Sequence, residues 1–166
     1  MGRGEAEDPP RLHRALTQAL LIGPVRLVLG LAAVALAVVS GLEAGRALAE
    51  SVAGAGLTIF ALAVPGGRRP PWRASGEPGP MPARARIERW WQTLAFAMFP
   101  STYGVAILAA VALTFSEGLV AFLGGVLVGM GLLTFVAAAR VSAWERNEGA
   151  HLFVDRTVAG RQFAQP

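Results

Sequence analysis

The stretch "GLVAFLGGVLVGMGLLTFVAAA", from Gly118 to Ala139, contains no charged residue. A bilayer core is about 30 Å thick, so a helix that crosses it needs roughly 20 mainly apolar residues. In lipid the backbone polar groups must also be satisfied inside the segment, as they are in a helix. The stretch therefore predicts a transmembrane helix.

The composition of the whole chain points to the same class. Hydrophobic residues make up 54% of the chain and charged residues 16%, whereas soluble domains carry roughly a quarter charged residues. Three further apolar blocks cover residues 20–42, 50–64 and 92–116. The second is short, and it needs residues 46–49 to reach spanning length. We expect an all-α integral membrane protein with four transmembrane helices; a soluble helical protein with an alanine- and leucine-rich core is the alternative.

The arginines set the expected orientation. Nearly all of them lie in the N-terminal segment, the middle connection and the C-terminal tail, and only Arg46 lies between the first two helices. Positively charged flanks stay in the cytoplasm. We expect a multi-pass protein of the inner (plasma) membrane with both termini cytoplasmic. Five residues are expected to anchor helix ends at the membrane interface: Trp90, Trp91, Trp144, Arg26 and Arg140.

A cleavable signal sequence is a second reading of the N-terminal part. Ala47-Leu48-Ala49 has the small-x-small form of a cleavage site after a basic start and an apolar stretch. Glu43 and Arg46 precede this site, where cleavable signals are usually uncharged. The sequence therefore favours a retained membrane helix.

Two patterns recur along the chain. "LAAVAL" occurs at 31–36 and 108–113, and G-x-G-L-x-x-F at 54–60 and 129–135, which are spacings of 77 and 75 residues. Such self-similarity predicts two parallel repeated hairpins, although shared apolar composition can also produce it. Pro24 and Pro100 lie upstream of the first pattern and should kink or break their helices.

The repeats divide the chain into expected regions. Apolar residues at three- and four-residue steps predict a short amphipathic interfacial helix before each hairpin. Repeat 1 then covers 11–64 and repeat 2 covers 84–140. Residues 1–10 should be a disordered N-terminus, 65–83 a Pro/Gly/Arg-rich cytoplasmic linker, and 141–166 a cytoplasmic tail that either docks or is unstructured.

Small residues recur at four-residue steps on two segments. Such residues let transmembrane helices approach closely. We expect helix packing at Gly41, Gly45, Ala121, Gly125 and Gly129.

Residues with catalytic or ligating chemistry are few. The chain has no cysteine and no lysine, and His13 and His151 are isolated, so we expect no cofactor, no metal site and no enzyme activity. One possible polar site follows Pro100, where a proline frees a backbone carbonyl beside Ser101, Thr102 and Tyr103. These hydroxyls either satisfy the kinked backbone or bind a ligand.

Two function classes fit these patterns. The first is a structural or accessory membrane protein that packs with itself or with other membrane subunits. The second is a small oligomeric transporter or channel, which needs a polar path. The lipid bilayer is the expected environment, and nucleic acid is not an expected partner because the formal net charge is only +4. The chain is rich in alanine and uses arginine in place of lysine throughout, which is typical of a GC-rich bacterial genome.

Overall fold

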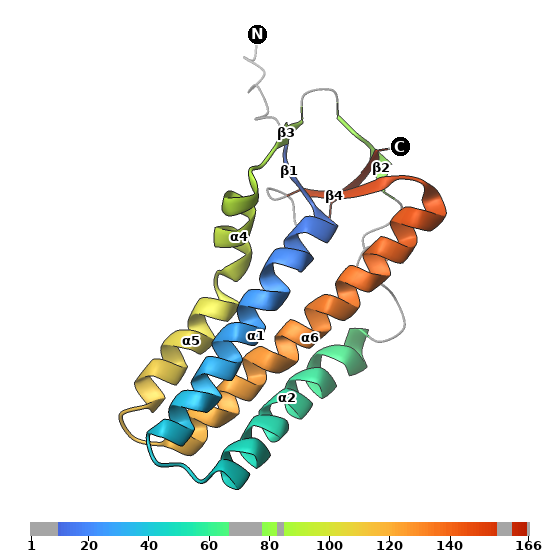
Figure 1. Ribbon diagram of the computed structural model, residues 1–166. Coiled ribbons are helices and arrows are strands. Elements are labelled where there is room, and N and C mark those ends of the chain that lie inside the picture. The colour runs from blue at the N-terminus through green and yellow to red at the C-terminus, as the bar shows by residue number, and fades with distance from the viewer. Residues whose placement is uncertain (1–9, 67–77, 83–84, 156–160, 166) are drawn as a thin grey trace.

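The computed structural model describes residues 10–66, 78–82, 85–155 and 161–165, which form a mostly helical bundle capped at one end by a small sheet (Figure 1). We call this the sheet end, and we call the opposite end, which holds the turns at residues 40–43 and 113–116, the turn end. The helices are α1 (Ala15–Val39), α2 (Ala44–Gly66), α4 (Trp90–Met98), α5 (Ser101–Ala112) and α6 (Glu117–Glu148).

Helix α6 contains the uncharged stretch and has well-defined ends. The Ser116 side chain accepts a hydrogen bond from the Leu119 N–H at 3.3 Å, and Glu117 lies in the first turn. Both features stabilise a helix N-terminus. Gly149 follows the last turn with a φ of 64°, a left-handed conformation that suits glycine. The helix therefore runs several residues beyond the apolar stretch.

The bundle is organised around α6. It packs antiparallel to α1, its most extensive contact, and parallel to α2. Glycines make both contacts close: a Cβ on Gly30 would lie 2.5 Å from the carbonyl oxygen of Gly124, and one on Gly54 would collide with the carbonyl oxygen of Phe122. Backbones can approach this closely only because a side chain is missing.

The two prolines have different effects. Pro24 lies inside α1, which continues through it. At Phe99 and Pro100 the chain leaves the helix, which divides the third apolar segment into α4 and α5. Helix α5 then restarts with a hydrogen bond from the Gly104 N–H to the Pro100 carbonyl at 2.8 Å.

A five-stranded sheet in the order β2-β5-β4-β1-β3 covers the sheet end. Its strands are β1 (Arg11–Arg14), β2 (Gly79–Pro80), β3 (Arg86–Ile87), β4 (His151–Asp155) and β5 (Gln162–Gln165). Strand β1 pairs in parallel with β3 and antiparallel with β4, and β5 joins β4 antiparallel and β2 in parallel.

The sheet changes two expectations from the sequence. The fold is not purely α-helical, and residues 11–14 and 86–87 are strands where interfacial helices are expected. Strand pairing with distant segments explains the difference, since β1 lies beside β4 and buries Leu12 against Phe153. The tail docks through this pairing. The expected disordered N-terminus, except Pro10, and most of the expected linker lie outside the described residues.

Two of the described helices, α1 and α6, are long and apolar enough to cross a membrane. This is a statement about length and composition. Helix α5 is apolar but shorter.

Candidate functional site

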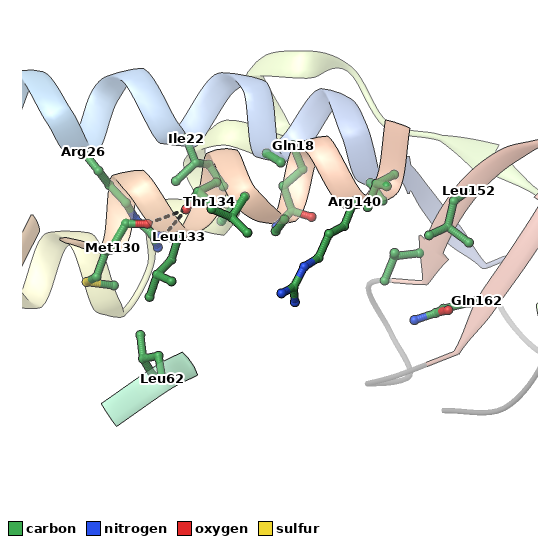
Figure 2. Close-up of a pocket in the computed structure, with 17 residues that line it drawn as sticks. Gln18, Ile22, Arg26, Leu62, Met130, Leu133, Thr134, Arg140, Leu152 and Gln162 are labelled. Atoms are coloured by element: carbon green, nitrogen blue, oxygen red, sulfur yellow. Dashed lines mark hydrogen bonds between the residues drawn. The ribbon is translucent and has the colours of Figure 1, made fainter. Parts of the chain in front are cut away.

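A pocket of about 670 Å³ lies toward the sheet end of the bundle. Its walls come mainly from α1 and α6, with single residues from α2 and α4 and a rim from β4 and β5 (Figure 2). Its volume is typical of small-molecule sites, which occupy roughly 300–1,000 Å³.

The lining of this pocket is apolar and positively charged. Most of the lining side chains are aliphatic, such as Ile22, Leu62 and Leu133. Arg26 and Arg140 add two guanidinium groups, and no acidic residue is among the described residues that line the pocket. The arrangement therefore favours a ligand that combines negative charge with apolar surface.

Arg26 reaches from α1 to hydroxyl groups on two other helices. Its Nε donates to Thr102 Oγ1 at 2.9 Å, its Nη2 to Ser101 Oγ at 3.1 Å, and its Nη1 to Thr134 Oγ1 at 3.1 Å. Thr102 is completely buried. The Thr134 hydroxyl in turn donates to the Met130 carbonyl at 2.7 Å, so its lone pairs face the guanidinium. We call this set of residues the Arg26 cluster.

The positive charge of Arg26 is hydrogen-bonded to neutral hydroxyl groups in this cluster. A guanidinium carries five N–H donors, and three of its hydrogen bonds go to these hydroxyls. The hydroxyls orient the group but do not neutralise it. Because Arg26 also lines the pocket, its positive charge lies at the pocket wall.

Arg140 lies closer to the sheet. Figure 2 shows its side chain extending away from the α6 ribbon, and Gln18 of α1 and Gln162 of β5 also line the pocket. Within the described part of the chain, Arg140 has no hydrogen bond or ion pair. The Gln18 oxygen lies 2.6 Å from His13 Nε2, which leaves the Gln18 amide nitrogen as a donor. Gln162 Oε1 is buried without a partner among the described residues.

The possible polar site at Ser101, Thr102 and Tyr103 is divided by the structure. Ser101 and Thr102 belong to the Arg26 cluster, whereas Tyr103 is 43% exposed and lies outside it. The guanidinium of Arg26, a residue expected to anchor a helix end at the membrane interface, donates to these hydroxyls. Arg26 precedes Ser101 by 75 residues in the chain, so local sequence patterns could not predict this contact.

The expected packing residues also separate into two groups. Ala121 is fully buried, and a Cβ on Gly129 would lie 2.9 Å from the Ala55 carbonyl oxygen. Gly125 sits against the Ser51 backbone. Gly41 instead occupies the first interhelical turn with a φ of 119°, and Gly45 is exposed beside Glu43.

The four-residue steps in the sequence missed five glycines at close helix contacts. Gly23 and Gly30 of α1 face Gly131 and Gly124 of α6, and Gly54 of α2 faces Phe122. A signal was present in the sequence. Gly23 and Gly30 are seven residues apart, as are Gly124 and Gly131, and seven residues are two turns of a helix. Seven-residue spacing keeps both members on one face.

The expected tryptophan anchors all lie near the sheet end. Trp90 and Trp91 are 61% and 51% exposed at the start of α4. Trp144 packs beside Val141 and Leu152, which joins α6 to the sheet.

A charged junction ties β1 to the end of α6, beyond the apolar stretch. Arg14 Nη2 donates to Glu145 Oε2 at 2.7 Å and lies 2.9 Å from His151 Nδ1. The Leu152 N–H donates to Glu145 Oε1 at 3.0 Å. Burial alone raises the pKa of Glu145, but the bonds from Arg14 and Leu152 outweigh it, so this pKa lies below its usual value. The junction fixes the sheet to the bundle.

Neither a metal site nor a similar known protein identifies a function for this pocket. No group of three or more His, Asp or Glu side chains that could hold a metal occurs in the described ranges. The chain matches no protein-family model, no curated protein and no solved structure.

Proposed function

We propose that the chain is a multi-pass membrane protein with a structural or accessory role. The observation that carries this proposal is the distribution of side-chain size. Large apolar residues face outward, with Val39 83%, Phe60 66% and Phe115 67% exposed, while the turn-end core consists of small residues such as Ala37 and Ala121. A soluble protein rarely exposes so large an apolar surface. Small residues inside and large apolar ones outside are typical of helices packed in lipid.

The proposed topology has four crossings. Helices α1, α2 and α6 are one crossing each, and α4 and α5 together are another. Arginines concentrate at the sheet end, and they are Arg11, Arg14, Arg86, Arg89, Arg140, Arg146 and Arg161. At the turn end, Arg46 is accompanied by Glu43, Glu50 and Glu117. The positive-inside rule then favours a cytoplasmic sheet end, with both termini on that side.

Two contacts support the proposed repeat. Strands β1 and β3 pair in parallel with Arg11 opposite Arg86, a separation of 75 residues. Helices α2 and α6 also run parallel, and Ala55 lies against Gly129, a separation of 74 residues. The first separation equals the 75-residue spacing of the second repeated pattern, and the second separation differs from that spacing by one residue. Corresponding segments side by side and parallel are what an axis along the membrane normal produces.

The accessory role is favoured over the channel by the turn end. Its core cluster is apolar and contains Ala37, Ala47, Ala112, Val120 and Ala121. A channel needs a polar path through this layer. The exposed apolar faces of the helices instead offer surface for packing against lipid, a second copy or another membrane subunit.

Gentle detergent extraction followed by native mass spectrometry tests the role. We expect a stoichiometric complex with other membrane proteins or with a second copy. A homo-oligomer that conducts ions in reconstituted vesicles would overturn the accessory role in favour of the channel. Reporter domains inserted after Pro80 and after Glu117 test the topology separately, and they should report opposite sides of the membrane.

A further inference from the structure

We propose that the pocket holds one anionic phospholipid, with its phosphate at Arg140 and its acyl chains along the apolar wall. This inference rests on the proposed membrane location. It adds a ligand class to a site that the accessory role does not require.

Charge is the first argument. Arg26 and Arg140 both line the pocket, and the described lining contains no carboxylate to balance them. An unbalanced charge at the depth of a membrane helix is costly. A bound phosphate lowers this cost, and arginine binds phosphate with paired charge-assisted hydrogen bonds. Basic pockets on the cytoplasmic side of helix bundles commonly bind anionic headgroups.

The polar atoms around Arg140 give a second argument. Arg140 has no partner within the described residues, and the Gln18 amide nitrogen is a further donor among the residues that line the pocket. Two sets of donors in one pocket suit the oxygens of a phosphodiester. The buried oxygen of Gln162 lacks a partner among the described residues, and a headgroup hydroxyl would supply a donor at this end.

The apolar walls distinguish a lipid from a free phosphate ion. Ile22 and Leu133 line the part of the pocket away from the sheet. Leu62 and Val136 also line it and are 56% and 48% exposed. The apolar wall therefore continues onto the outer surface of the helices. A phospholipid can leave its headgroup inside while its chains extend along this surface into the bilayer.

Native mass spectrometry of the full chain in detergent tests the proposal. The probes are phosphatidylglycerol, phosphatidylcholine and palmitate, each added at the same concentration. We expect preferential retention of phosphatidylglycerol by the unchanged chain. Arg140→Gln should weaken this retention by about tenfold, the loss expected for one good charge-assisted contact. Arg146→Gln removes the same charge from an exposed position of α6 outside the pocket and should leave retention unchanged.

A second variant guards against a folding defect. Ala137→Phe fills the pocket without changing the charge, and it should also reduce retention of phosphatidylglycerol. Equal retention by the Arg140 and Arg146 variants, or no preference over phosphatidylcholine, would overturn the proposal. Retention of palmitate at or above phosphatidylglycerol would overturn the assignment to a phospholipid. These failures leave the membrane location intact, whereas a chain that is folded and monomeric in buffer without detergent overturns the membrane location itself.

Discussion

The turn end and the sheet end of the bundle contain different kinds of residues and pack differently. At the turn end, alanines and glycines bring helix backbones into contact, and the core contains no charged group among the described residues. Toward the sheet end, Arg26 bridges three helices and an open pocket lies beside it. Close packing therefore fixes the helices at one end, while polar groups and space at the other end are available for a ligand.

The largest expected effect is at the close helix contacts. Gly54→Ala places a methyl group against the Phe122 carbonyl oxygen, which only a shift of α2 or α6 relieves. Overpacking of this kind costs on the order of 3 kcal/mol. We expect a large fall in melting temperature in detergent, measured by circular dichroism.

The matched control for this change is on the same helix. A Cβ on Gly56 meets nothing within 4 Å, so Gly56→Ala should leave the melting temperature unchanged or slightly raised through helix propensity. Equal destabilisation by the two variants would contradict the close contact of α2 with α6 at Gly54.

A smaller effect is expected in the Arg26 cluster. Thr102→Val keeps the shape of the buried side chain but removes a hydrogen bond from Arg26. Leaving a polar group without its partner costs about 1–3 kcal/mol. Unfolding in detergent should show this loss, while Tyr103→Phe, one residue along and exposed, should change little.

A double variant isolates the interaction. With Arg26→Met in place, Thr102→Val should cost much less than it does alone, since the donor is gone. A full cost in both backgrounds would mean that Thr102 acts through packing and not through Arg26.

The smallest effect is expected at the junction between the sheet and α6. Because the pKa of Glu145 in the folded chain lies below its unfolded value, the carboxylate stabilises the fold at neutral pH. This contribution is lost as the pH falls below the ordinary pKa of a glutamate and through the lower folded pKa. Glu145→Gln should lower stability at pH 7 by about 1.5 kcal/mol.

The pH dependence provides the check on this prediction. The stability difference between Glu145→Gln and the unchanged chain should shrink toward acid pH, as followed by thermal unfolding at several pH values. Glu148→Gln, at an exposed neighbouring position, should show no such trend. A constant difference across pH would argue against the ionised bond to Arg14.

How far the sequence predicts this fold depends on whether an element is local. The uncharged stretch 118–139 predicts a helix that the structure contains within α6, because apolar length and helical hydrogen bonding are properties of one segment. Strands β1 and β3 could not be predicted in the same way. Leu12 has apolar neighbours at helical spacing, but its strand forms by pairing with β4, far along the chain.

The candidate site shows the same limit. The hydroxyls of Ser101 and Thr102 stand out in the sequence after Pro100, but their partner Arg26 comes from another helix. Arg140 can be placed near a helix end by composition, yet its position in a pocket with Gln18 and Gln162 depends on how three elements meet. Tertiary contacts, and not local patterns, create the site.

The most direct test of the account is the accessibility of single cysteines. The chain has no cysteine, so each substitution introduces the only thiol. Glu43→Cys and Glu117→Cys mark the turn end, and Arg86→Cys and Arg146→Cys mark the sheet end. We predict that a membrane-impermeant maleimide labels only the turn-end thiols in intact cells and labels the sheet-end thiols after permeabilisation. Equal labelling of both ends in intact cells would contradict a bundle that crosses the membrane with its arginine-rich sheet in the cytoplasm.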